Sequence, residues 1–323
     1  MEALVWMGGD RLDIETLPDP VAGDDEVLFD VVLAGICGSD MHAYRGAGGK
    51  RVPPLILGHE AVGRVEGDDQ LFVAFPLLGC QTCAICVEGH ENLCPDRTLL
   101  GLDRPGTFAS RVVVPASALL PVPKGLSADV AALTEPLATA IGIFEGVEFS
   151  PGEVVHVIGC GSIGLLVVYY AVHHGCTVVV TDPIEARRDL ARQMGAAFSV
   201  ASAQDFDPRS AHYVIDAVGV EATWSAGLRS VRPGGVVVVV GLGQSSGTVA
   251  IGDMVRAGIT LKGSYAYSRE NFAEALELLS EVPINATWLE RMALHDGQAA
   301  FDHLANADTA AIKILLQPDG VID

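Results

Sequence analysis

Basic residues are scarce in this chain, and it has no long hydrophobic run. Lys and Arg together number 20 of 323 residues against 41 Asp and Glu, so the formal net charge is −21. So acidic a surface repels nucleic-acid phosphates and anionic lipid, and we expect neither nucleic acid nor a membrane as a partner. The longest apolar stretches, Ile163–Val172 and Val236–Val240, fall well short of the roughly 20 residues of a spanning helix, although the mean hydropathy is +0.36.

Charged residues make up only 19% of the chain and hydrophobic residues 50%, which excludes a disordered or fibrous protein. The length predicts about two domains. The segment Met1–Asp10 has no basic region before an apolar stretch, so we expect no signal peptide. The seven cysteines are an odd number, and four of them lie in one short cluster, which indicates metal binding in a reducing compartment rather than a disulfide framework. We therefore expect a cytoplasmic protein.

The first part of the chain, residues 1–136, is rich in prolines and turns, with short β-type runs such as Glu26–Leu33 and Arg111–Val114 between them. This pattern predicts a mostly β domain with long loops, including a cysteine-bearing lobe over residues 79–95. Beyond it the pattern changes, and apolar β-runs alternate with helix-like stretches. The predicted β-runs are Val154–Ile158, Thr177–Thr181, Tyr213–Ile215 and Val236–Val240, and the predicted helices are Ser162–His173 and Ile184–Met194.

This alternation predicts an α/β domain over residues 137–265, a doubly wound parallel sheet with helices on both faces. Residues 266–323 contain an amphipathic helix, Arg269–Ser280, and end in a β-run, Ala311–Leu316. We expect this tail to pack back on the N-terminal domain.

A glycine-rich motif follows the first of these β-runs and opens the first helix. Its sequence is Gly159-Cys160-Gly161-Ser162-Ile163-Gly164, and Asp182 ends the next β-run. Glycines here permit a tight turn and close approach of a pyrophosphate, while an acidic side chain at the second position accepts from a ribose 2′-hydroxyl. The alternative is a plain glycine turn with a capping aspartate. The motif favours NAD over NADP. Arg187 and Arg188 follow soon after Asp182 and could pair a 2′-phosphate, although such arginines more often form a solvated helix face.

The cysteine cluster has the spacing of a closed zinc site. Cys80, Cys83, Cys86 and Cys94 lie within 15 positions on a loop that also contains Gly79 and Gly89. Four thiolates at this spacing suit one tetrahedral, structural zinc ion. Four free buried cysteines or an iron–sulfur cluster fit the spacing less well.

A third group of candidate ligands is spread along the chain. Cys37 begins the segment Cys37-Gly38-Ser39-Asp40-Met41-His42, His59 and Glu60 follow Gly58, and Glu135 lies in Thr134-Glu135-Pro136. Cys, His and Glu are zinc ligands, and three of them with one open position form a catalytic arrangement. Each residue also has an ordinary interpretation, as a buried thiol, a core histidine or an acid at a helix start, and spacing alone does not show that they converge.

The combination of motifs resembles the zinc-dependent medium-chain alcohol dehydrogenases over nearly the whole chain. The segments 35–40 and 58–65 resemble that family's first zinc-ligand motif and its G-H-E-x-x-G-x-V signature, and Cys80 to Cys94 resemble its structural-zinc lobe. Glu135-Pro136-Leu137 is similar to the E-P-L segment of its sorbitol, butanediol and threonine dehydrogenase branch. The resemblance implies a GroES-like catalytic domain, a Rossmann domain and two zinc ions per chain.

The resemblance also implies roles for single residues. Cys37, His59 and Glu135 would hold the catalytic zinc, with Glu60 adjacent to it. Ser39 would take the substrate's hydroxyl proton, His42 would pass it to solvent, and Asp40 would fix the tautomer of His59. The expected cofactor contacts are Gly159, Gly161, Ser162, Ile163, Gly164, Asp182, Arg187, Val218, Gly241 and Gly243.

Two features depart from the family pattern. Asp69–Val73 replaces the usual G-D-R-V strand, and Ala266-Tyr267 stands where polyol dehydrogenases often carry Arg-Tyr. By their positions relative to the motifs, Tyr44, Phe108 and Tyr267 are candidates for the wall of a substrate pocket. Such a wall suits a neutral secondary alcohol or polyol, or its ketone. A sugar phosphate or amino alcohol stays open, through Arg45 or Arg51 for a phosphate, although such arginines more often lie in solvent.

Two other functions stay open from the sequence. One is a zinc-free quinone or enone reductase on the same scaffold, and the other is a non-catalytic NAD-binding sensor with structural zinc only. Zinc stoichiometry separates the three, at about two, zero or one ion per chain. The run Gly258–Tyr265 could pair edge to edge across a two-fold axis, so we expect a homodimer or homotetramer.

Overall fold

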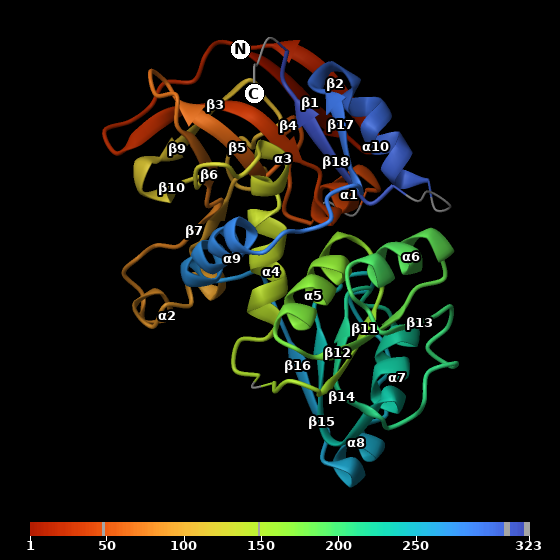
Figure 1. Cartoon of the computed structure of the whole chain (residues 1–323). Coiled ribbons are helices and arrows are strands. Elements are labelled where there is room, and N and C mark those ends of the chain that lie inside the picture. Colours follow the sequence, from red (N-terminus) through yellow and green to blue (C-terminus); the bar gives the residue numbers. More distant parts are fainter. Residues whose placement is uncertain (47–48, 148, 307–310, 320–323) are drawn as a thin grey trace. The chain divides into compact units, whose positions relative to one another are not determined.

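The computed structural model describes residues 1–46, 49–147, 149–306 and 311–319 (Figure 1). The chain divides into two compact units. Unit 1 comprises Met1–Ala138 and Ser268–Asp323, and unit 2 comprises Thr139–Tyr267. The boundaries expected from the sequence, after residues 136 and 265, fall two residues before each division. No helix in the described part of the chain is long and apolar enough to cross a membrane.

Unit 1 is mostly β-structure. Its strands are β1 (Glu2–Gly8), β2 (Arg11–Thr16), β3 (Glu26–Gly35), β4 (Leu55–Ile56), β5 (Glu60–Val65), β6 (Leu71–Ala74), β7 (Leu77–Leu78), β8 (Thr98–Leu99), β9 (Arg111–Pro115), β10 (Leu119–Pro121), β17 (Leu289–Ala293) and β18 (Lys313–Gln317). Its helices are α1 (Gly38–Tyr44), α2 (Ala84–Val87), α3 (Ala128–Ala131), α9 (Arg269–Glu281) and α10 (Gly297–Ala305), with short 3-10 turns at Glu91–Leu93, Ala116–Ala118 and Leu294–Asp296.

The main sheet of unit 1 has the order β10-β6-β5-β3-β18-β17, and β9 also pairs with β3. Strand β18 pairs antiparallel with β3 through Leu315↔Gly35 and Leu316↔Ala34. The C-terminal tail therefore does return to the N-terminal segment, as expected. The pairing also places Lys313, the first residue of β18, beside the loop that follows β3.

The segment that departs from the family pattern still forms a strand. β6 pairs with β5 through Val62↔Val73 and with β10 through Leu119↔Ala74. The structure adds β17 and α10 to the tail, where the sequence indicated one helix. The polar pattern of β17 gives little signal for a strand, and the segment is extended because it pairs in parallel with β18.

Unit 2 is a six-stranded parallel sheet with the order β13-β12-β11-β14-β15-β16. Its strands are β11 (Val154–Ile158), β12 (Thr177–Thr181), β13 (Phe198–Val200), β14 (Ala211–Asp216), β15 (Val231–Val239) and β16 (Thr260–Gly263). Its helices are α5 (Ser162–His173), α6 (Glu185–Gln193), α7 (Glu221–Ser230) and α8 (Ile251–Ala257), while α4 (Thr134–Ile143) begins in unit 1 and ends in unit 2. The expected fold class is confirmed: a mostly β unit and an α/β unit built on a parallel sheet.

Candidate metal and nucleotide sites

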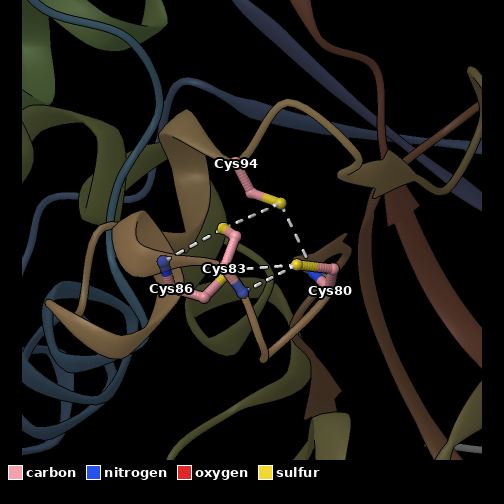
Figure 2. Close-up of side chains that lie close together, drawn as sticks. All are labelled: Cys80, Cys83, Cys86 and Cys94. Atoms are coloured by element: carbon pink, nitrogen blue, oxygen red, sulfur yellow. Dashed lines mark hydrogen bonds between the residues drawn. The ribbon is translucent and has the colours of Figure 1, made fainter.

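Four cysteine sulfurs converge on a short lobe of unit 1 (Figure 2). Cys80 follows β7, Cys83 is the N-cap of α2, and Cys94 ends a 3-10 turn. The Sγ atoms of Cys80 and Cys86 are 4.0 Å apart, and those of Cys83 and Cys94 are 3.8 Å apart. Four sulfurs at about 2.3 Å from one tetrahedral zinc ion would be about 3.8 Å apart, so this lobe has the size of a zinc–thiolate site.

Backbone amides prepare this lobe for negative charge. The N–H of Cys83 donates to Cys80 Sγ at 3.3 Å, and the N–H of Cys86 donates to Cys83 Sγ at 3.4 Å. The pKa of Cys80 is lowered to about 6 by hydrogen bonds from the backbone N–H and the hydroxyl of Thr82, and by one from the backbone N–H of Cys83. The pKa of Cys86 is raised to about 12, mainly by burial, so a full set of four thiolates needs a cation among them. The donor set therefore fits one structural zinc ion.

A second group of ligand atoms lies inside unit 1. The ligand atoms of Cys37, His59 and Glu60 lie within 4.8 Å of one another. Cys37 caps α1 directly after β3, while His59 and Glu60 lie at the start of β5. Strand pairing sets Gly35 opposite Glu60, and a Cβ at Gly35 would lie 2.1 Å from Glu60 Oε2. Glycine at that position is what lets the carboxylate turn toward the cluster.

The charges of this cluster are balanced by a buried lysine. Lys313, on β18, is 1% exposed and donates to Glu60 Oε1 at 2.6 Å and to the carbonyl oxygen of Ile36 at 3.1 Å. Burial alone would lower the pKa of Lys313, but the negative charges of Glu60, Cys37 and Glu135 outweigh it, and the pKa is raised. Nothing in the sequence pattern indicated Lys313, because a single lysine in an apolar β-run carries no motif.

The same surroundings disfavour a free thiolate at Cys37. Burial, followed by the charge of Glu60, raises the pKa of Cys37 to about 11. Among the described residues, the Oδ1 atom of Asp40 and the Nδ1 atom of His59 are buried and have no hydrogen-bond partner. A soft and a hard anionic ligand beside a histidine, in a place where thiolate formation is costly without a cation, fit a zinc ion that compensates the negative charge.

Glu135 does not belong to the group that the structure brings together. It lies in the first turn of α4, is 9% exposed, and is near enough to Lys313 for its charge to raise the pKa of that lysine. The sequence left open whether Glu135 or Glu60 binds the catalytic ion at rest, and that choice stays a prediction. Among the described residues, the ligand atom of Glu60 is the one that lies with those of Cys37 and His59.

Two of the three predicted catalytic residues lie next to the cluster of Cys37, His59 and Glu60. Ser39 Oγ lies 3.4 Å from His59 Nε2. The carboxylate of Asp40, fully buried, accepts from the backbone N–H of Cys37 at 3.1 Å and lies 3.7 Å from His59 Nδ1. His42 lies one turn further along α1 and is half-buried. Its pKa is lowered, first by burial and then by the charges of Arg45 and Arg51.

Arg51 lies much deeper than the sequence indicated. Its side chain is 8% exposed, and its Nε donates to the carbonyl oxygen of Gly101 at 3.0 Å. Its Nη2 lies 3.4 Å from Ser39 Oγ and 3.7 Å from Asp40 Oδ1. Arg45, in contrast, is exposed and donates to the carbonyl oxygen of Ala305.

The three aromatic residues predicted to form the wall of a substrate pocket are all buried. Phe108 is fully buried in the core of unit 1, with its ring edge-to-face against Phe301. Tyr44 packs on the same ring and donates its hydroxyl to Asp302. Tyr267, at the end of unit 2, is 1% exposed. The three rings are buried by the protein's own side chains, and their place in the wall of a substrate pocket stays a prediction.

In unit 2 the glycine motif forms a strand–turn–helix, as predicted. Gly159 has φ of +94°, and a Cβ at Gly164 would lie 1.8 Å from the carbonyl oxygen of Gly159. Ser162 and Ile163 open α5. The turn is tied to the next strand by Asp182, whose carboxylate accepts from the N–H of Cys160 at 2.8 Å and from that of Ile184 at 2.9 Å.

A pocket of about 400 Å³ opens at the carboxyl ends of these strands, where ligands bind in sheets of this type. It includes Gly159, Asp182 and Val218 among its lining residues. Burial raises the pKa of Cys160 to about 12, and the charges of Arg187 and Arg188, on α6, partly oppose this rise. Arg188 also donates to the carbonyl oxygen of Asp182 at 2.6 Å.

The remaining predicted cofactor residues lie on two loops in contact. Gly243 N donates to the carbonyl oxygen of Val218 at 3.1 Å, and a Cβ at Gly241 would lie 2.2 Å from the carbonyl carbon of Val218. Asp216, at the end of β14, organises the first loop, since its carboxylate accepts from the N–H groups of Val218 and Gly219, both at 2.9 Å. Sequence reasoning missed Asp216, although it follows a predicted strand just as Asp182 does.

Both units match models of known protein families. Residues 23–124 match the model of the alcohol dehydrogenase GroES-like domain, and residues 162–281 match that of the zinc-binding dehydrogenases. The chain is 32% identical to an L-threonine 3-dehydrogenase from Anaeromyxobacter sp. over 96% of this chain and 95% of that protein. It is 29% identical to sorbitol dehydrogenase from Bacillus subtilis over 99% and 98%.

A solved structure gives the same picture. That of acetophenone reductase from Geotrichum candidum, in complex with NAD, is 27% identical and superposes with a TM-score of 0.89 over 98% of this chain and 96% of that chain.

Proposed function

The chain belongs to the zinc-dependent medium-chain alcohol dehydrogenases, oxidoreductases that act on CH–OH groups, and from this membership we propose that it transfers a hydride between NAD and a secondary alcohol or polyol, or the matching ketone. The observation that carries the proposal is the convergence of Cys37, His59 and Glu60 from two separate segments. A sensor with structural zinc only would have no need of this second cluster.

Two zinc ions per chain are part of the proposal. Cys80, Cys83, Cys86 and Cys94 would hold the structural ion, which leaves no open position for substrate. Cys37 and His59, with the carboxylate of Glu60 or Glu135, would hold the catalytic ion. A zinc ion with an open position supplies Lewis acidity that lowers the pKa of an alcohol.

The chain's own residues would manage the proton. Ser39 Oγ, which lies at the cluster, accepts the proton of the substrate hydroxyl as it releases its own hydrogen outward. His42, half-buried on the same helix and with a lowered pKa, takes up that proton for solvent. The charge of Asp40, whose Oδ1 lies 3.7 Å from His59 Nδ1, would favour a proton on that nitrogen, which leaves Nε2 available to a metal. Bound NAD⁺ would supply the hydride acceptor, so that an alcohol that loses its proton through Ser39 would give a ketone, NADH and H⁺.

NAD rather than NADP is the proposed cofactor. Gly159, Gly161 and Gly164, with the amides that open α5, suit a pyrophosphate, and Ser162 and Ile163 begin that helix. The carboxylate of Asp182 already accepts two backbone amides and still has lone pairs for a ribose hydroxyl, whereas it would repel a 2′-phosphate. Val218, Gly241, Gly243 and Arg187 complete the proposed cofactor contacts.

An amino alcohol is the second candidate substrate. The relative from Anaeromyxobacter is named for L-threonine and the one from Bacillus subtilis for sorbitol, and the identity to both is similar. A neutral polyol and a zwitterionic amino alcohol therefore both belong in a first panel.

The experiment follows NAD reduction by absorbance across secondary alcohols, polyols, amino alcohols and sugar phosphates, with and without a chelator. We expect at least one substrate whose oxidation is lost on chelation and restored by zinc. Turnover that survives complete removal of zinc would contradict the proposal.

We also propose that the protein is a cytoplasmic homodimer or homotetramer. The support is β16 (Thr260–Gly263), an edge strand of the unit 2 sheet that leaves Leu261 37% exposed. A monomer by light scattering would contradict this association.

A further inference from the structure

One guanidinium group reaches the residues of the proposed proton path. Arg51 Nη2 lies 3.4 Å from Ser39 Oγ and 3.7 Å from Asp40 Oδ1, and the charge of Arg51 is one of the causes that lower the pKa of His42. Resting on the proposed function, we infer that Arg51 is a positioning residue of the active site, which holds Ser39 in the one orientation that lets it accept the substrate's proton.

Arg51 is firmly held in unit 1. Its side chain is 8% exposed, Nε donates to the carbonyl oxygen of Gly101, and the buried carboxylate of Asp40 compensates its charge. A planar guanidinium fixed at one edge presents its remaining N–H groups in fixed directions. Arg51 can therefore define the orientation of a neighbour, which a mobile lysine on the surface could not do.

The next step is the hydrogen-bond capacity of Ser39. A hydroxyl accepts two hydrogen bonds and donates one. The N–H of Arg51 fills one lone pair of Ser39 Oγ. The other lone pair is then the only place for the proton of a substrate hydroxyl, and the hydrogen of Ser39 must point to a third group. With all three positions assigned, the proton has one path, between the substrate, Ser39 and the outer group: it moves outward when an alcohol is oxidised and inward when a ketone is reduced.

His59 Nε2 is a second group that can accept the hydrogen of Ser39. Ser39 Oγ lies 3.4 Å from His59 Nε2, the ring nitrogen that does not face Asp40. A metal held by His59 Nε2 takes up the lone pair of that nitrogen, so the hydrogen of Ser39 loses this acceptor. Arg51 keeps its contact in either case, because it approaches Ser39 with a donor and does not depend on His59.

A different role for Arg51 would be to bind an anionic group of the substrate. Its Nε and Nη2 are directed to Gly101, Ser39 and Asp40, and its charge is already compensated by a carboxylate, which together favour positioning over anion capture. The two roles predict different kinetics. Positioning affects neutral and charged substrates alike, whereas anion capture affects the KM of charged substrates only.

The test compares Arg51→Met and Arg51→Lys with wild type, and uses Arg45→Met as the matched control. Arg45 is also a cation near His42, but it is exposed and donates to Ala305 instead of Ser39. With sorbitol or L-threonine as substrate, whichever the wild type oxidises, we expect kcat of Arg51→Met to fall about 10–100-fold with KM nearly unchanged. The solvent deuterium isotope effect on kcat should rise, because the proton step then limits the rate, and Arg51→Lys should recover part of the loss.

A binding measurement gives a readout that does not depend on turnover. Dimethyl sulfoxide, a neutral mimic of a ketone, accepts a hydrogen bond from Ser39, and its binding to the NADH complex can be followed by nicotinamide fluorescence. We expect about fivefold weaker binding in Arg51→Met, the loss of one oriented hydrogen bond, and no change in Arg45→Met. If Arg51→Met does not fold, Arg51→Lys carries the comparison, with a smaller change in the same direction.

Two results would overturn the inference alone. One is an unchanged kcat and isotope effect in both Arg51 variants, and the other is a rise in KM confined to anionic substrates. A wild-type chain that binds NADH and zinc but neither oxidises an alcohol nor binds the sulfoxide would overturn the proposed function, and this inference with it.

Discussion

The glycine turn of unit 2 is built from residues that are close in sequence, whereas the buried cluster of unit 1, Cys37, His59 and Glu60 with Lys313, is built from residues far apart in sequence. The turn Gly159–Gly164 lies between β11 and α5, and its partner Asp182 comes one strand later. In unit 1, by contrast, the ion pair between Lys313 and Glu60 joins residues 253 positions apart. A change in the local turn is therefore expected to alter only contacts close to it in sequence, whereas a change in the distant cluster leaves a buried charge without its partner.

The largest effect should come from removing a metal ligand in unit 1. We expect Cys37→Ala to lose one zinc ion and to reduce turnover by about 10³-fold or more, because zinc supplies several kcal/mol of stabilisation of the reacting oxygen. NADH affinity should stay within about twofold, since the nucleotide turn is built in unit 2 without Cys37. Metal analysis, steady-state kinetics and NADH fluorescence measure the three quantities. Retained turnover in the zinc-depleted variant would show that the buried cluster of unit 1 is not needed for the reaction.

The next effect tests the dependence of distant partners on one another. Lys313→Met leaves the fully buried carboxylate of Glu60 without its cation, and we expect the free energy of unfolding to fall by about 3–5 kcal/mol. In the double variant Lys313→Met with Glu60→Gln, much of this loss should be recovered. Chemical denaturation of the single and double variants measures both values. Additive losses would show that the pair is not coupled in the way its geometry indicates.

A buried histidine in unit 2 provides the local counterpart. His156, on β11, is fully buried beside Thr181, with its Nε2 2.7 Å from the Thr181 hydroxyl, and burial lowers its pKa from 6.5 to about 4. The unfolded chain therefore takes up this proton near pH 6.5 and the folded chain only near pH 4. The free energy of unfolding should fall by about 3 kcal/mol as the pH drops between these values.

The control for this prediction is His156→Val, which removes the titrating group. The difference in unfolding free energy between wild type and variant, measured by denaturant titration from pH 4 to 7, should shrink or change sign toward acid. A difference that stays constant across this range would mean that His156 does not titrate as its burial requires.

The smallest effect should be on cofactor choice. In Asp182→Ala the turn loses two backbone contacts and its negative charge, so we expect NAD to bind about tenfold more weakly and the preference over NADP to narrow. Zinc content, a property of unit 1, should not change. Equal use of NAD and NADP by the wild type would remove this assignment.

The same contrast explains how far the sequence could be interpreted. In unit 2 the apolar runs predicted β11, α5 and β12 with their observed bounds, because each is a continuous segment with its own period. In unit 1 the four clustered cysteines were equally clear, since they are close in sequence.

The buried cluster was harder to predict. The motifs supplied Cys37 and His59, but spacing could not show that Glu60 lies with them, that Lys313 pairs with it, or that Arg51 is buried beside Ser39. Those facts depend on the pairing of β18 with β3 and on the path of the loop before β4, which no local pattern contains. The burial of Tyr44 and Phe108 was not predictable for the same reason, since burial is a property of the whole fold.

The account depends most directly on a second, catalytic zinc ion. The decisive measurement is the zinc content per chain of the native protein and of Cys37→Ala, determined by mass spectrometry on samples shown to bind NADH. We predict two zinc ions in the native chain and one in the variant, with the remaining ion held by the four-cysteine lobe. One zinc ion in the native chain, with none lost in Cys37→Ala, would contradict the account.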